Sequence, residues 1–361
     1  MQLLKGIQTG WVLATLLWTG APVTARPHQQ PQQGPLVRKE WRTLSNHEKS
    51  SYLCAVKCLM RKPALTPAFD NTGVISRYDD LVYTHILQTF DIHYTGHFLA
   101  WHRYYVAVYE RMLRDECHYQ GAQPYWDWTL DTPADQWAAS PIFDPVTGFG
   151  GNGAPVAGDP TNPMEVPGRT GGGCVQDGPF AGIPDMVHLG PMDSVTYNPQ
   201  CLKRDFSPYF AGRYLAMNQT QLTLAAPDFG AFGRVVEGGP SFDASGVHGG
   251  GHYGVGGTYG QIGDLYTSPA DPIFYLHHAN LDRVWWSWQK LDLGARLTDI
   301  SGPIFLMDYE NLKGGNVTLE FPLSAGVSAA NVTVGDVMNI AACGQNGVLC
   351  YEYDEVYTLQ G

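Results

Sequence analysis

The stretch HFLAWHRYYVAVYERMLRDE, from His97 to Glu116, predicts a helix with one aromatic and apolar face. Large side chains recur along it at steps of three and four residues, which is the spacing of neighbours on one face of a helix; they are Phe98, Trp101, His102, Tyr105, Tyr109 and Met112. A buried imidazole needs a hydrogen-bond partner or a metal. The stretch therefore raises the question of whether its histidines are packed in a core or hold a ligand.

Three further segments carry helix signals, and they are residues 37–60, 75–92 and 272–288. The first contains Ser45 followed three residues later by Glu48, the pattern of a capping box. The second places His85 on an apolar stripe at helical spacing. We expect a helix in each segment.

The rest of the chain predicts long loops and a few short strands. Residues 141–200 and 238–263 are rich in glycine or proline, and the segments NVTLEF and NVTVGDVM after residue 300 alternate like short strands. A hydrophobic content of 44% allows a sizeable core, and no linker marks a second domain. We expect one mainly α domain over residues 37–361. The net charge of −12 argues against a nucleic-acid partner, which requires a basic face.

The first 25 residues resemble a secretory signal peptide. Lys5 supplies a basic start, Trp11 to Trp18 form an apolar run, and small residues end at Ala25. The alternative is an ordinary buried helix. Residues 26–36 are rich in proline and glutamine and are expected to be disordered. No run reaches the roughly 20 apolar residues that span a bilayer, so we expect a secreted, extracellular protein without a membrane segment.

Glycosylation signals and cysteines agree with secretion. Three sequons begin at Asn218, Asn316 and Asn331. Most of the seven cysteines should pair in an oxidising compartment, and the odd number leaves at least one unpaired within the chain. Cys54 and Cys58 have the spacing of one helix face, so we expect them to bond to different partners.

Histidines fall in two groups on or beside the expected helices. The first contains His85, His93, His97 and His102, and the second contains His248, His252, His277 and His278. A lone histidine on an apolar face is more often a hydrogen-bonded core residue than a ligand. Two buried imidazoles on neighbouring helices each need a partner, and a shared metal satisfies both.

His248 and His252 are separated by three glycines. This spacing places both rings on one face of a helical turn. Each glycine costs about 1 kcal/mol of helix stability relative to alanine, so close backbone approach or an open site explains them better than stability does. A zinc protease needs glutamate directly after the first histidine, and Gly249 stands there instead.

His277 and His278 are adjacent, so on a helix they point about 100° apart and only one faces the cavity. The apolar stripe through Phe274, Leu281 and Val284 favours His277 as the ligand. His278 is then expected to contact a ring or a carbonyl. Two sets of three imidazoles result, namely His85, His93 and His102, and His248, His252 and His277. Imidazole suits copper, zinc, iron and nickel, and three nitrogens leave an open position on each metal.

At these residues the sequence resembles the tyrosinase family of type-3 dicopper proteins, which includes catechol oxidases and hemocyanins. The two copper motifs of the family match the strings FLAWHR (98–103), HGGGH (248–252) and DPIFYLHHANLDR (271–283). A string that the family has between these motifs matches PYWDW (124–128). The tyrosine motif at the end of the family's core domain matches CYEY (350–353). The resemblance covers residues 37–355. It implies a central four-helix bundle that holds two copper ions and uses O₂. The chain is similar to short, secreted, fungal-like members, for which no C-terminal lid domain is expected.

The resemblance also implies roles around the copper ligands. Gly249 and Tyr253 follow the first two histidines of the second motif and shape the substrate pocket, and Leu265 aligns with a position that gates it. Glu237 is a candidate water-holding carboxylate, although a surface glutamate is the alternative. Phe274, His278 and Asp282 are expected next to the ligands.

We therefore expect a polyphenol oxidase that uses O₂ to convert catechols, and by extension o-aminophenols, to o-quinones. Gly249 carries no side chain that helps deprotonate a phenol, so monophenol hydroxylation is expected to be weak or restricted. The alternatives are a full tyrosinase, a hemocyanin-like O₂ carrier and a helical domain without metal.

Overall fold

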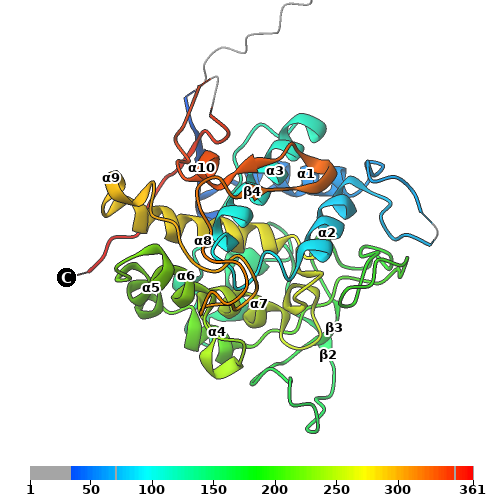
Figure 1. Ribbon diagram of the computed structural model, residues 1–361. Helices are drawn as coiled ribbons and strands as arrows, with labels where there is room; N and C mark the ends of the chain where they lie inside the picture. Colours follow the sequence, from blue (N-terminus) through cyan, green and yellow to red (C-terminus); the bar gives the residue numbers. More distant parts are fainter. Residues whose placement is uncertain (1–33, 70, 345–346, 361) are drawn as a thin grey trace, which may run out of the picture. The chain divides into compact units, whose positions relative to one another are not determined.

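The computed structural model describes residues 34–69, 71–344 and 347–360, and helices dominate them (Figure 1). The long helices are α1 (Asn46–Leu59), α2 (Arg77–Gln88), α3 (Phe98–Cys117) and α8 (Ile273–Lys290). Shorter ones are α4 (Pro208–Tyr214), α5 (Met217–Leu224), α6 (Phe229–Glu237), α7 (Val247–Gly256), α9 (Leu293–Arg296) and α10 (Val334–Val337). The predicted mainly α fold is confirmed, as are the helices expected around His85, His102 and His277.

Local sequence explains where α1 and α2 begin. The predicted capping box of α1 is present, because Ser45 Oγ accepts from the Glu48 amide and the Glu48 carboxylate accepts from the Ser45 amide. Ser76 and Asp79 form the same arrangement at the start of α2. Such boxes satisfy amides that have no partner within the helix. Both helices are therefore marked in the sequence before any tertiary contact is considered.

Helix α8 lies at the centre of the fold. Every residue from Ile273 to Gln289 is buried, so this helix has no solvent-facing side. It packs against α3, and Figure 1 shows the two helices crossing in the core. Asp282 of α8 accepts hydrogen bonds from Arg103 of α3 and from the hydroxyl groups of Tyr351 and Tyr353, at 2.6 Å for each tyrosine. These contacts fix α8 against α3 and the end of the chain.

Strands are short and pair two by two among the described residues. β1 (Leu36–Arg38) pairs in parallel with β6 (Tyr351–Tyr353), β2 (Gly153–Pro155) with β3 (Gly172–Val175), and β4 (Pro322–Leu323) with β5 (Val332–Thr333). The first pair brings Arg38 to Glu110, with 2.5 Å between Nη2 and Oε2. It thereby ties both ends of the described chain to the helical core.

Two expectations about the termini and strands need correction. Leu36 lies in β1, so the segment expected to be disordered ends earlier than residue 36. The segment NVTLEF forms no strand, and NVTVGDVM contributes only Val332 and Thr333 to β5 before α10 begins. The physical reason is a capping box of Thr333 and Asp336, which starts a helix inside the alternating pattern. The predicted signal peptide, residues 1–25, lies outside the described residues.

Three disulfides join Cys58 to Cys117, Cys174 to Cys201, and Cys343 to Cys350. The first ties α1 to the last residue of α3. Cys54 is exposed and forms no disulfide within the described ranges, so the expectation that it bonds to a partner of its own is wrong. Within the described ranges, no helix combines the length and the hydropathy that crossing a membrane requires.

Candidate metal centre

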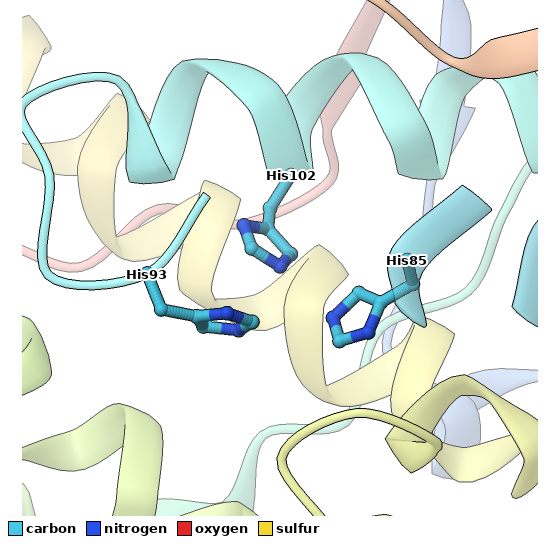
Figure 2. Close-up of side chains that lie close together, drawn as sticks. All are labelled: His85, His93 and His102. Carbon is cyan, nitrogen blue, oxygen red and sulfur yellow. The ribbon is translucent and has the colours of Figure 1, made fainter. Parts of the chain in front are cut away.

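One triad of imidazoles comes from the first half of the chain. His85 lies on α2, His93 on the loop after α2, and His102 on α3, and their rings converge on one point (Figure 2). One nitrogen from each ring lies within 4.8 Å of the others, and all three side chains are buried. The structure thus brings together the three residues that the sequence grouped as the first ligand set.

Backbone carbonyls orient the rings of this first triad. Nδ1 of His85 is 2.7 Å from the carbonyl oxygen of Tyr266, and Nδ1 of His93 is 2.7 Å from that of Thr89. Nδ1 of His102 is 2.9 Å from the carbonyl oxygen of Phe98. Because a carbonyl only accepts, each Nδ1 carries the proton and each Nε2 keeps a free lone pair. Within the described part of the chain, the buried Nε2 atoms of His85 and His102 have no hydrogen-bond partner, as expected of metal ligands.

A second triad consists of His248 and His252 on α7 and His278 on α8. Here too one nitrogen from each ring lies within 4.8 Å of the others, and all three side chains are buried. Nδ1 of His252 is 2.6 Å from the carbonyl oxygen of Ile262, and its Nε2 is 3.1 Å from Nε2 of His278. Nε2 of His248 is buried, and no residue that the structure describes forms a hydrogen bond with it.

The assignment of His277 to this second set is corrected by the geometry. Nε2 of His277 lies 3.0 Å from the carbonyl oxygen of His248 and does not join the triad, whereas His278 does. An apolar stripe favoured His277 in the sequence, but α8 is buried on all sides, so no stripe distinguishes a face directed at the metal. His278 takes the place of His277 in the candidate ligand set.

The glycines between His248 and His252 allow close approach, as expected. A Cβ on Gly251 would lie 2.2 Å from Cε1 of His277, and one on Gly250 would lie 2.8 Å from Cδ2 of Leu215. A Cβ on Gly249 would lie 2.2 Å from Oγ of Ser245. The space beside Gly249 is therefore held by a neighbouring hydroxyl, while Gly251 makes room for an imidazole.

The two triads face each other across a short gap. The rings of His102 and His278 are stacked with centroids 4.5 Å apart, and those of His93 and His248 with centroids 5.8 Å apart. The ring of Phe98 lies 4.6 Å from that of His248 and also contacts His102. Two metal ions in these triads would be close enough to act on one small bridging molecule.

Electrostatics favours neutral imidazoles here. Burial lowers the pKa of His93 and His252 to about 4, and burial also holds the pKa values of His85, His102, His248 and His278 well below the ordinary range. Metal ligation requires the neutral form of histidine. Six neutral, buried imidazoles with free or converging nitrogens fit a pair of copper ions, and no carboxylate belongs to either described triad.

Glu237, the candidate water-holding carboxylate, is buried at the end of α6, so the alternative of a surface glutamate is wrong. Its Oε1 accepts a hydrogen bond of 2.6 Å from the amide of Tyr94, the residue after His93. It lines a small cavity together with Tyr94, Phe98 and Tyr309. Burial raises the pKa of this carboxyl well above its usual value.

The remaining predicted residues occupy different surroundings. Gly249 is buried and Tyr253 half-buried on α7, and Leu265, directly before Tyr266, is 36% exposed. Phe274 is buried with its ring 4.1 Å from that of His278. His97 lies outside the triads, and the centroid of its ring is 4.3 Å from that of Phe321. The sequon residues Asn218, Asn316 and Asn331 are all exposed.

Two carbonyl groups that orient ligands were not found from the sequence. Tyr266 and Ile262 hold His85 and His252 through backbone oxygens, and a backbone atom leaves no signal in the residue type. By contrast, Phe98 stands four residues before His102 on the same helix, a spacing that helical geometry makes foreseeable.

Comparison with known proteins agrees with this geometry. A family model described as the common central domain of tyrosinase matches residues 75–291. The tyrosinase-like protein phomQ1 of Diaporthe leptostromiformis is 37% identical over 345 residues, covering 92% of this chain and 80% of the relative. The N-acetyl-6-hydroxytryptophan oxidase ivoB of Emericella nidulans is 35% identical, with 95% and 100% covered. The solved structure of a mutant polyphenol oxidase from Thermothelomyces thermophila is 39% identical in sequence, with a TM-score of 0.77 and 89% of each chain covered.

Proposed function

Because this chain belongs to the tyrosinase family of copper oxidoreductases, we propose that it oxidises catechols and o-aminophenols to the corresponding o-quinones and quinone imines with O₂. The family acts on small phenols and uses a pair of copper ions, and the chain is an oxidase of the polyphenol oxidase type. The observation that carries the proposal is the pair of facing imidazole triads, one of His85, His93 and His102 and the other of His248, His252 and His278.

These six histidines would hold two copper ions, which supply the exchange of electrons between the phenol and O₂. The protein orients the imidazole rings and excludes water from around them. Carbonyl groups of Tyr266, Thr89 and Ile262 turn the rings inward, and Phe98 and Phe274 pack against them. Oxidation of one catechol releases two electrons and two protons, so two catechols convert one O₂ to two molecules of water.

Weak or restricted hydroxylation of monophenols is the finer part of the proposal. Glu237 would hold a water molecule near the phenol, since it is buried next to the residue that follows His93. Burial raises the pKa of Glu237 and so favours its neutral form, which is a poor acceptor for the phenol proton. Gly249 offers no side chain to help, and Ser245 Oγ occupies the space beside it. Because Glu237 is present but position 249 has no side chain to assist it, deprotonation of a monophenol is expected to be slow. A catechol needs no hydroxylation and is not affected. A full tyrosinase is the alternative outcome.

Oxygen consumption by copper-loaded protein with a catechol, an o-aminophenol and a monophenol tests this function. We expect fast uptake with the first two and a slow rate after a lag with the third. Equal rates for the monophenol and the catechol would identify a full tyrosinase. Reversible O₂ binding without quinone formation would identify a carrier and contradict the proposal, as would fewer than two copper ions per chain.

We further propose that the protein is secreted. Three disulfides and exposed asparagines in all three sequons support an oxidising, glycosylating compartment. Expression of the full chain in a eukaryotic host, with immunodetection in medium and cells, tests this. Protein in the medium whose mass falls after endoglycosidase treatment agrees with it, whereas retention of an unglycosylated chain in the cytosol contradicts it.

A further inference from the structure

Trp128 ends the string PYWDW, and its indole lies against the imidazole of His277 with 5.1 Å between the ring centroids. Both side chains are 0% exposed. Nε1 of Trp128 and Nδ1 of His277 are both buried polar atoms that have no hydrogen-bond partner among the described residues. Two unsatisfied atoms on neighbouring rings are costly separately, because each has lost its water. Because the two rings lie against each other, a single water molecule between them would satisfy both atoms.

The protonation of His277 follows from its other nitrogen. Nε2 of His277 lies 3.0 Å from the carbonyl oxygen of His248, which only accepts, so Nε2 carries the proton. The ring is fully buried, which favours the neutral form, so Nδ1 carries a lone pair and needs a donor. The indole nitrogen of tryptophan is a donor that cannot accept. The unpartnered acceptor and the unpartnered donor are thus complementary.

The contact between His277 and His248 fixes the position of His248. In His85, His93, His102 and His252 a ring nitrogen bonds to a backbone carbonyl and fixes the direction of the ring. For His248 no such ring contact is found among the described residues. Its backbone carbonyl is held instead, by His277. Gly251 permits this approach, because a Cβ there would lie 2.2 Å from the His277 ring.

We infer that Trp128 and His277 are positioning residues for the proposed copper ligand His248. The indole N–H of Trp128 donates to one buried water, which donates in turn to Nδ1 of His277, and Nε2–H of His277 donates to the carbonyl oxygen of His248. This inference rests on the proposed function, since it assigns a role toward the second copper. It also gives the string PYWDW a part in the site, at a residue that belongs to neither histidine triad.

The test compares Trp128→Phe with Trp137→Phe. Trp137 is also fully buried with an unpartnered Nε1, but its ring neighbours are Trp126 and Phe143 and not a histidine. Copper affinity of the metal-free proteins is measured by competition with a chromophoric chelator. Groups that orient metal ligands typically contribute about 10- to 100-fold in affinity. We expect Trp128→Phe to weaken one of the two copper sites by about 10-fold and Trp137→Phe to leave both unchanged.

Two substitutions at His277 extend the test. His277→Phe removes both nitrogens and should weaken the same site by about 100-fold, whereas the amide of His277→Gln can still donate to His248 and should recover part of the loss. Equal affinities in Trp128→Phe, Trp137→Phe and the wild type would overturn the inference, as would a wild-type affinity in His277→Phe.

If the variants do not fold, nitrogen NMR of the histidine-labelled wild type identifies the tautomer of His277. The Nε2–H tautomer supports the inference, and the Nδ1–H tautomer would overturn it. A wild type that binds fewer than two copper ions overturns the proposed function and this inference together. A wild type that binds two and oxidises catechol, with a Trp128→Phe variant of unchanged affinity, overturns the inference alone.

Discussion

The two histidine triads reach similar geometry by different routes. The first stands on α2, which begins with a capping box, on α3, and on the loop between them. The second stands on α7, whose sequence VHGGGHYGVG is half glycine and has no side-chain cap, and on the fully buried α8. Helix formation is locally favoured in α2 and locally disfavoured in α7. The first site is thus largely a product of local sequence, and the second depends on packing around it.

The largest expected effect separates His278 from its neighbour. His278→Ala should lose one copper ion and all catechol oxidation, as His102→Ala should in the first triad, because two imidazoles remain where three are needed. His277→Ala should keep both ions at full loading, with weaker binding. Copper analysis and oxygen consumption measure this. Loss of copper in His277→Ala with retention in His278→Ala would restore the assignment made from sequence.

The next largest effect is on stability and concerns the contact between α3 and α8, which each carry one histidine of a triad. His102 lies on α3 and His278 on α8. Asp282 of α8 contacts Arg103 of α3 directly, and it also contacts Arg38, which pairs with Glu110 of α3. Breaking a buried ion pair by removing one partner costs about 3–5 kcal/mol. Asp282→Ala should therefore lower the free energy of unfolding by that amount in urea titrations of the metal-free protein.

Asp243 supplies the control, because its ion pair with Arg213 is exposed. Asp243→Ala should change the free energy of unfolding by less than about 0.5 kcal/mol. Equal losses in Asp282→Ala and Asp243→Ala would mean that the buried cluster does not stabilise the contact between α3 and α8.

A smaller effect addresses the dependence of α7 on packing. Gly251→Ala places a methyl group 2.2 Å from the His277 ring and should destabilise the protein by about 1–3 kcal/mol, despite the better helix propensity of alanine. Gly233→Ala on α6 meets nothing within 4 Å and should stabilise by about 0.5–1 kcal/mol. Thermal unfolding measures both, and stabilisation by both would contradict a packing role for Gly251.

The smallest effect concerns the start of α2. His188 Nδ1 lies 2.9 Å from Oδ2 of Asp79, which forms the capping box of that helix together with Ser76. Burial lowers the pKa of His188, but the hydrogen bond and charge of Asp79, with Asp185 nearby, outweigh it and raise the pKa above 6.5. A raised pKa means that this contact stabilises the protein fully below pH 6.5 and that the contribution is lost as pH rises through the folded-state pKa.

His188→Gln tests that sign. The difference in melting temperature between wild type and variant should be largest near pH 6 and should shrink toward pH 8. A difference that stays constant across this range would show that His188 contributes through packing alone.

Much of the site could be predicted from particular residues. His85, His93 and His102 have no adjacent histidine that competes with them, so spacing and motif were sufficient. The pair His277 and His278 could not be resolved, because a helix that is buried on every side has no apolar stripe to define the inner face. Glu237 could not be placed either, since a single glutamate gives no sign of its own burial.

The sequence by itself determined the mainly α fold, the first triad, the membership of His248 and His252 in the second, and the capped starts of α1 and α2. These depend on side-chain spacing and on hydrogen bonds within a few residues. Only the tertiary structure decided that His278 completes the second triad and that the carbonyls of Tyr266 and Ile262 hold His85 and His252. The physical reason is that these contacts join backbone and side-chain atoms from distant segments, whose meeting is set by packing and not by local sequence.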